Sequence, residues 1–120
     1  GSCRDLAMLM VECCRSVGLP ARFTSGYQLI DPPPADYDLH AWAEIYLPGA
    51  GWRGFDPSAG SEINERYIVL ASSSKPELTA AVSGNFTGPP NTSSTLNWTI
   101  NAQIAGVKHD GTAMKTAQAA

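Results

Sequence analysis

The chain has 120 residues, 43% of them hydrophobic, so it is long enough and apolar enough to fold around one core. Its formal net charge of −3 and the absence of a strongly basic stretch argue against nucleic acid as a partner. Because no apolar run in the sequence approaches the roughly 20 residues needed to cross a bilayer, we also expect no membrane partner.

The first predicted element is a helix over residues 3–17, CRDLAMLMVECCRSV. Ser2 and Asp5 have the spacing of a capping box, with Ser2 as the N-cap and Asp5 at the third helical position. Gly18 and Pro20 predict where the helix ends. The charged and polar residues fall in one narrow strip and apolar side chains cover the remaining girth. We therefore expect a central helix that is buried on most sides.

Strand-forming residues dominate the middle of the chain. Residues 21–30 alternate between apolar and polar and predict a strand. Residues 39–47 and 51–56 flank the turn sequence PGAG, which predicts a β-hairpin. Further strands are predicted over residues 66–71 and 94–105. One helix followed by antiparallel strands is an α+β arrangement, and this is the predicted fold class.

The end of the chain has a different character. The sequence VKHDGTAMKTAQAA has no coherent apolar period, so we predict a frayed tail over residues 107–120. Residues 1–106 are then the predicted core domain. No internal repeat divides that domain further.

Cys3, His40 and Asp56 have the residue types of a nucleophilic triad. The positive end of the helix dipole favours the thiolate form of a cysteine in the first helical turn. His40 is a candidate base for that thiol, and Asp56 is a candidate group to orient the imidazole. His40 and Asp56 share a sheet face only if the hairpin pairs residues whose numbers sum to an even value, such as Tyr46 opposite Trp52. An odd register would place them on opposite faces.

These residues also have simpler interpretations. A cysteine at a helix start is usually a small buried residue, and a lone histidine in a strand is usually a structural one. An aspartate before proline, as in Asp56-Pro57, is commonly a turn former. From the residues alone, the triad and these simpler roles both stay open.

The three cysteines do not form a disulfide framework, and with no signal peptide apparent we expect a reducing, cytoplasmic location. A metal site from Cys3, Cys13, Cys14, His40 and His109 is disfavoured because no Cys-x-x-Cys spacing exists. We expect no metal and no cofactor. A redox pair of Cys3 with Cys13 or Cys14 is also disfavoured, since the ten helical residues from Cys3 to Cys13 already span about 15 Å.

At the triad residues the sequence resembles the transglutaminase-like cysteine enzymes of bacteria, relatives of animal transglutaminases and peptide N-glycanases. The likeness is carried by GSCRDLAMLMVECCRSVGLPARFTSGY and HAWAEIYLPGAGWRGFDPS and continues weakly through RYIVLASSSKPELTAAVSGNFTG. The resemblance implies Cys3 as the nucleophile, His40 as the base and Asp56 as the orienting carboxylate. It also implies a papain-like transglutaminase core, in which the cysteine helix packs on an antiparallel β-sheet.

The chemistry implied by the resemblance is attack of a thiolate on a carboxamide, which gives a thioester that water hydrolyses or an amine cross-links. We therefore expect an acyl-transfer enzyme acting on protein or peptide amides, as a protease-like amidohydrolase or a transglutaminase. The alternative is a non-catalytic binding or assembly module with the same fold. Trp42, Tyr46 and Trp52 are aromatic candidates for substrate contacts. Because members of this family carry more chain before the cysteine, including a residue that helps to hold the oxyanion, we expect an upstream part to be missing.

Overall fold

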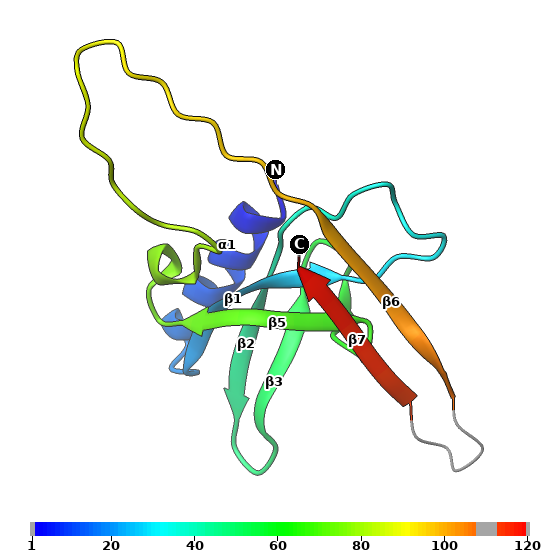
Figure 1. Ribbon diagram of the computed structural model, residues 1–120. Helices are drawn as coiled ribbons and strands as arrows, with labels where there is room; N and C mark the ends of the chain where they lie inside the picture. Colours follow the sequence, from blue (N-terminus) through cyan, green and yellow to red (C-terminus); the bar gives the residue numbers. More distant parts are fainter. Residues whose placement is uncertain (1, 108–112, 120) are drawn as a thin grey trace. The chain divides into compact units, whose positions relative to one another are not determined.

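The computed structural model describes residues 2–107 and 113–119. Its chain divides into two compact units, namely Gly1–Gln28 with Asp38–Val82, and Leu29–Tyr37 with Ser83–Ala120. The first unit contains the α-helix and a five-stranded sheet, and the second contains a two-stranded sheet (Figure 1). The α+β class predicted from the sequence is confirmed. No helix in the part of the chain that the structure describes is long and apolar enough to span a membrane.

Helix α1 spans Cys3–Ser16 and begins where the sequence predicts. The predicted capping box is present, because the Ser2 hydroxyl accepts a hydrogen bond from the Asp5 N–H and the Asp5 carboxylate accepts one from the Ser2 N–H. Gly18 follows the helix with a φ of +85°, a backbone conformation that glycine adopts without steric cost. The first turn of α1, which carries Cys3, is therefore fixed by local interactions.

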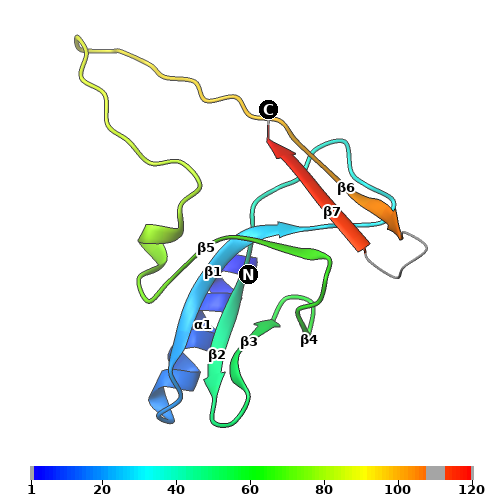
Figure 2. The same cartoon turned by 60° about the horizontal axis from the view of Figure 1, so that its bottom comes forward.

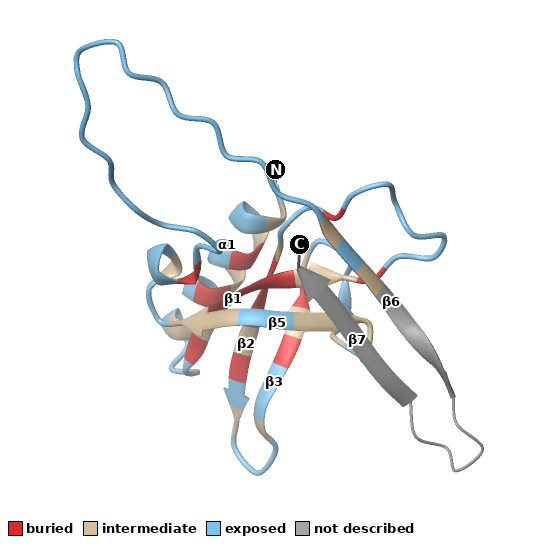
Figure 3. Cartoon of the chain, in the orientation of Figure 1, coloured by how far each residue is buried: buried red, intermediate tan, exposed pale blue. Residues whose placement is uncertain are grey.

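The apolar arc of α1 is covered on one face only. Ala7 and Val11 are buried against the sheet, whereas Leu9 is 61% exposed and Val17, directly after the helix, is 73% exposed. Figure 3 shows that α1 has both buried and exposed segments. The expectation that the helix is buried on most sides is therefore wrong for the described residues. A sequence shows that a side chain is apolar but does not show whether another element lies against it.

The five-stranded sheet is antiparallel and has the order β4-β3-β2-β1-β5. Its strands are β1 (Ala21–Gln28), β2 (His40–Leu47), β3 (Gly51–Asp56), β4 (Ser61–Glu62) and β5 (Tyr67–Ser73). Helix α1 packs across β1 and β2 (Figure 2). The four longer strands lie where the sequence predicts them, with ends shifted by up to two residues, and the short β4 was not predicted.

The hairpin of β2 and β3 has the even register that the proposed triad requires. Tyr46 pairs with Trp52, so His40 and Asp56 lie on the same face of the sheet, one diagonal step apart. Alternate residues of β2 point the other way, where Ala41 and Ala43 pack into the core with side chains of α1 and β1. Strand β2 therefore presents its apolar face to the helix and His40 to the opposite face.

The buried indole of Trp42 shares that opposite face. Its side chain is 0% exposed, and its ring lies edge-on to the ring of Tyr67 with centroids 5.3 Å apart. Gly26 on β1 makes room for it, since a Cβ atom there would lie 2.7 Å from the Trp42 ring and would collide with the carbonyl oxygen of Ile68. The close contact of these strands thus depends on a glycine at position 26.

The second unit contains β6 (Ile100–Val107) and β7 (Ala113–Ala119), which pair antiparallel with Ile100 opposite Ala119. The predicted strand over residues 94–105 thus begins later than expected. Strand β7 lies within the predicted frayed tail, which is wrong for those seven residues. Strand β7 forms by pairing with β6, although its sequence lacks the apolar alternation from which strands are predicted. Residues 83–99, which precede β6, are exposed.

Candidate active site

Cys3 is the first residue of α1 and lies half-buried at the end of the helix. It packs against a small apolar cluster of Ala7, Phe23 and Ala41, which joins the helix to β1 and β2. The first backbone N–H groups of a helix have no intrahelical acceptor and form the positive end of the helix dipole. Cys3 therefore lies at the positive end of the dipole of α1.

A pocket of about 160 Å³ brings Cys3 and His40 together. Its walls come from α1, β1, β2 and the segment around the 3-10 helix η1 (Pro76–Thr79). The lining residues are Cys3, Arg4, Phe23, Ser25, Leu39, His40, Ala41, Thr79 and Ala80. The Ser25 hydroxyl donates a buried hydrogen bond of 2.5 Å to the Thr79 carbonyl oxygen, which fixes the η1 wall against β1. Cys3 at the start of α1 and His40 at the start of β2 thus both line one mostly apolar pocket, although the alternation along β2 directs the His40 ring to the face opposite the helix.

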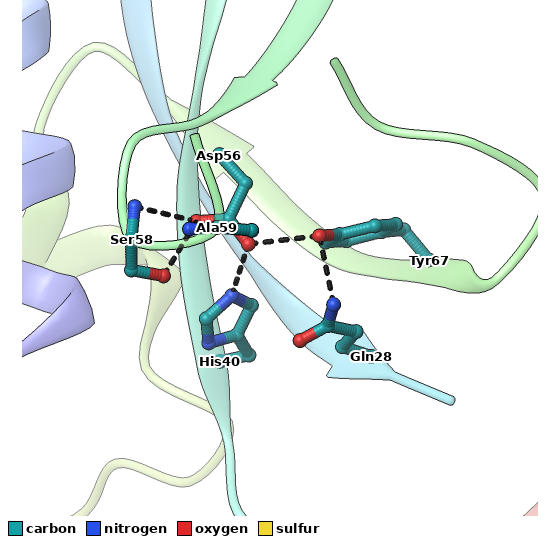
Figure 4. Close-up of polar contacts among 6 residues, drawn as sticks. All are labelled: Gln28, His40, Asp56, Ser58, Ala59 and Tyr67. Carbon is teal, nitrogen blue, oxygen red and sulfur yellow. Dashed lines mark hydrogen bonds and ion pairs between the residues drawn. The ribbon is translucent and has the colours of Figure 1, made fainter. Parts of the chain in front are cut away.

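His40 and Asp56 are in direct contact. The distance from His40 Nε2 to Asp56 Oδ2 is 2.6 Å, with the histidine side chain 18% exposed and the aspartate side chain 0% exposed (Figure 4). The contact that an even hairpin register allows is therefore present. Because Nε2 is occupied by the carboxylate, Nδ1 is the ring nitrogen left to serve a group in the pocket.

Every acceptor position of the Asp56 carboxylate is engaged. Oδ1 accepts from the Ser58 N–H at 2.9 Å, the Ser58 hydroxyl at 2.6 Å and the Ala59 N–H at 3.2 Å, while Oδ2 accepts from His40 and from the Tyr67 hydroxyl at 2.9 Å. Burial alone would raise the pKa of Asp56. The hydrogen bonds from Ser58, His40, Tyr67 and Ala59 outweigh burial and lower this pKa to about 2. Asp56 is thus an anion at neutral pH, so the Nε2 atom that faces it carries a proton.

Tyr67 is the part of this site that sequence reasoning missed. Its hydroxyl donates to Asp56 and accepts a hydrogen bond of 2.9 Å from the Gln28 side-chain amide (Figure 4). Burial raises the pKa of Tyr67, and the hydrogen bond and charge of Asp56 raise it further, to about 12. Tyr67 lies in the strand predicted over residues 66–71, but no spacing in the sequence connects it with Asp56, so no local signal could have found it.

The three aromatic residues predicted to contact substrate do not line this pocket. Trp42 is fully buried, and its Nε1 atom has no hydrogen-bond partner among the described residues. Tyr46 and Trp52 pair edge to face with centroids 5.7 Å apart and are 41% and 43% exposed. The apolar walls of the pocket come instead from Phe23 and Leu39.

The remaining cysteines differ from Cys3 and from each other. Cys13 is exposed, which is a further departure from the expected helix that is buried on most sides. Cys14 is half-buried, and burial together with the adjacent Cys13 raises its pKa. Within residues 2–107 and 113–119, no group of three histidine, cysteine, aspartate or glutamate side chains gathers as a metal site, and His109 lies outside the described residues.

Part of the chain matches a known protein family. Residues 1–57 match the family model of the transglutaminase-like superfamily. This stretch contains Cys3, His40 and Asp56, together with α1 and the hairpin that hold them. Tyr67 and the η1 wall lie beyond it. No solved structure matches the chain.

Comparison with curated proteins gives relatives that are much longer than this chain. An uncharacterized protein of Mycobacterium bovis is 38% identical over 80 residues, which cover 58% of this chain and 26% of that protein. A protein-glutamine gamma-glutamyltransferase of Pseudomonas aeruginosa is 37% identical over 65 residues, 48% of this chain and 10% of that protein. An uncharacterized protein of Bacillus subtilis, YebA, is 32% identical over 71 residues, which cover 50% of this chain and 10% of that protein. The chain therefore spans about a quarter or less of these relatives.

Proposed function

We propose, from the premise that this chain belongs to the transglutaminase-like superfamily, that it catalyses cysteine-dependent acyl transfer on protein or peptide amides. The observation that carries the proposal is the convergence of Cys3 and His40 on one pocket, with Asp56 Oδ2 2.6 Å from the far nitrogen of the imidazole. The helix start packed on an antiparallel sheet fits a papain-like core, which is part of the proposal. The name of the Pseudomonas relative supports acyl transfer as the reaction class.

The first half-reaction makes a thioester. His40 Nδ1 takes the thiol proton of Cys3, and the thiolate attacks the carboxamide carbon to form a carbon–sulfur bond. The negative charge moves to the amide oxygen, where the Cys3 backbone N–H at the helix start is one available donor. His40 then protonates the amide nitrogen, the carbon–nitrogen bond breaks, and ammonia or an amine leaves.

The second half-reaction removes the acyl group from Cys3. His40 Nδ1, now neutral, takes a proton from an incoming water molecule or primary amine as it attacks the thioester. Water gives a carboxylic acid and an amine gives a new amide, and the thiolate departs in both cases. Hydrolysis and cross-linking therefore share the same three side chains and differ in which acceptor reaches the pocket.

Asp56 has a supporting role in both halves. As an anion it keeps the proton of the imidazole on Nε2, so that Nδ1 has the free electron pair. It also stabilises the imidazolium that forms when His40 accepts the thiol proton. Its burial keeps water from weakening that interaction.

The proposal is tested by acylation of the thiol with p-nitrophenyl acetate. Attack by Cys3 forms an acetyl thioester and releases p-nitrophenolate, so a burst of colour equal to one enzyme equivalent is expected, with the acetyl group on Cys3 by peptide mass spectrometry. Cys3→Ala should abolish the burst. Cys13→Ala is the matched control, because it removes an exposed thiol of the same helix, and the burst should persist.

A second measurement identifies the acceptor and addresses the alternative function. A glutamine-containing peptide is incubated with the enzyme, with and without a fluorescent primary amine, and the products are separated by mass. Incorporation of the amine indicates a transglutaminase, and conversion of glutamine to glutamate, or cleavage, indicates a hydrolase. A folded protein that binds the peptide, while Cys3 is acetylated no faster than Cys13, would contradict the enzyme proposal and favour a binding module.

A further inference from the structure

The hydrogen bond between Tyr67 and Asp56 joins strands that are not neighbours. Asp56 ends β3 and Tyr67 begins β5, and both β2 and β1 lie between these strands in the sheet order. The Tyr67 hydroxyl nevertheless reaches Oδ2 of Asp56, the same oxygen that accepts from His40 at 2.6 Å. The two donors therefore meet at one atom, and the position of that atom depends on β2 and on β5 together.

The direction of the Tyr67 hydroxyl is determined by a second contact. Gln28 lies opposite Tyr67 in the β1–β5 register, and its side-chain amide donates to the tyrosine oxygen at 2.9 Å. Because that oxygen already accepts from Gln28, its own proton is directed to the carboxylate. The ring of Tyr67 is held by the edge-on contact with Trp42 and lies 6.2 Å from the His40 ring. The position of the Tyr67 hydroxyl and the direction of its O–H bond are thus both fixed.

The two oxygens of Asp56 are held in different ways. Oδ1 is held by Ser58 and Ala59, which follow Asp56 directly in the chain and anchor the carboxylate by a local turn. Those donors leave Oδ2 free to move about the anchored oxygen. Tyr67 supplies the long-range contact that fixes Oδ2, and this is the oxygen on which the orientation of His40 depends.

We propose that Tyr67 is a positioning residue for acyl transfer, which together with Gln28 holds Asp56 Oδ2 so that His40 presents Nδ1 to Cys3. This inference rests on the proposed function. Tyr67 contacts neither the thiol nor the substrate amide and acts through Asp56. Since Tyr67 lies outside residues 1–57, the working unit of the site extends beyond the stretch that matches the family.

The test is Tyr67→Phe, which keeps the aromatic ring against Trp42 and removes only the hydroxyl. Single-turnover acylation by p-nitrophenyl acetate should slow about tenfold, the order expected when a hydrogen bond to a charged group is lost. In protein labelled with ¹⁵N-histidine, the resonance of the His40 Nε2–H group, identified by its absence in His40→Gln, should shift. Gln28→Leu should change both measurements in the same direction by a smaller amount.

Ser72→Ala is the matched control. Ser72 and Thr24 share a side-chain hydrogen bond of 2.8 Å between the same two strands, β1 and β5, without contacting Asp56. Loss of that bond should leave the acylation rate and the His40 resonance as in the wild type. A change in this control equal to that of Tyr67→Phe would overturn the proposal, because any damage to β5 would then suffice.

The outcomes separate this proposal from the proposed function. If Tyr67→Phe folds, acylates at the wild-type rate and leaves the His40 resonance unshifted, Tyr67 has no positioning role, although acyl transfer still stands. If the wild type does not acylate Cys3, the proposed function fails, and an unshifted resonance in Tyr67→Phe would overturn the positioning role as well. If Tyr67→Phe does not fold, Gln28→Leu decides by the same two measurements.

Discussion

The two ends of the β2–β3 hairpin carry side-chain pairs on one sheet face but in different surroundings. At the open end, the side chain of His40 is 18% exposed and that of Asp56 is 0% exposed. Both oxygens of the Asp56 carboxylate accept hydrogen bonds there. At the turn end, Tyr46 and Trp52 pair edge to face with about two-fifths of each residue exposed. The register decides which side chains meet, and enclosure decides how strongly they interact.

The enclosure at the open end has a specific source. Trp42 and Tyr67 lie beside the imidazole, with ring centroids 6.1 Å and 6.2 Å from it, and they exclude water from the carboxylate behind it. At the turn end, the guanidinium of Arg22 stacks 4.2 Å from the centre of the Trp52 ring. Interactions that involve a charge strengthen as the effective dielectric constant falls. The charged contact at the enclosed open end therefore stabilises the fold more than the charged contact at the exposed turn end.

The largest expected effect comes from truncating the enclosing indole. Trp42→Ala should lower the free energy of unfolding by about 3–5 kcal/mol, because it removes a fully buried aromatic side chain. Trp52→Ala is the matched change at the turn end and should cost about 1 kcal/mol, the scale of its cation–π contact. Urea denaturation of both variants tests the comparison, and equal losses would show that enclosure does not distinguish the two ends.

The next effect concerns the proposed chemistry. Asp56→Asn should leave the fold in place, since an amide fills the same volume, but it removes the charge that orients and stabilises the imidazole. We expect single-turnover acylation of Cys3 to fall by roughly 10- to 10³-fold, less than the ~10⁴ seen for the corresponding change in a serine protease, because a thiol ionises more readily than a hydroxyl. Circular dichroism checks the fold. A folded variant with the wild-type rate would make Asp56 a turn residue.

The lowered pKa of Asp56 predicts a pH dependence of stability. Its folded value of about 2 lies below the ordinary value of 3.8, so its contribution is fully present above pH 4 and is lost as pH falls towards 2. The difference between the two values corresponds to about 2 kcal/mol. Urea denaturation between pH 2 and pH 5 should show this loss in the wild type and a flatter profile in Asp56→Asn. Parallel profiles would contradict it.

The smallest effect is expected for an exposed ion pair on the neighbouring strands β3 and β4. The side chains of Arg53 and Glu62 are in contact but are 48% and 45% exposed. Arg53→Ala should therefore change the free energy of unfolding by less than about 1 kcal/mol, and the difference should shrink further in high salt. A loss as large as that of Trp42→Ala would mean that exposure does not set the strength of these contacts.

The sequence was most informative where interactions are local. The capping box joins Ser2 and Asp5, three positions apart, and could be predicted. The hairpin could be predicted as well, but its register stayed open, and the structure shows the even register that places His40 and Asp56 on one face. The predicted substrate contacts of the three aromatic residues stay a prediction, and the strand pattern around Trp42 does not show whether its face is open to a ligand or closed by another ring.

The features that could not be predicted depend on residues far apart in the chain. Tyr67 reaches Asp56 only because β5 folds back beside β1, and Thr79 lines the pocket only because η1 is fixed to Ser25. Neither contact leaves a local spacing in the sequence. The half-covered apolar arc of α1 has the same cause, since composition cannot show which face of a helix finds a partner.

The hydrogen bond from Ser25 to Thr79 has a consequence for the order in which the site is assembled during synthesis. A ribosome makes Cys3 before His40, and both before the segment that carries Thr79 and Ala80, so the thiol exists before its base and before one wall of its pocket. A nascent chain ending soon after residue 57 has all three proposed catalytic side chains but neither Tyr67 nor the η1 wall. The pocket is therefore complete only when residues up to Ala80 are available to fold against β1.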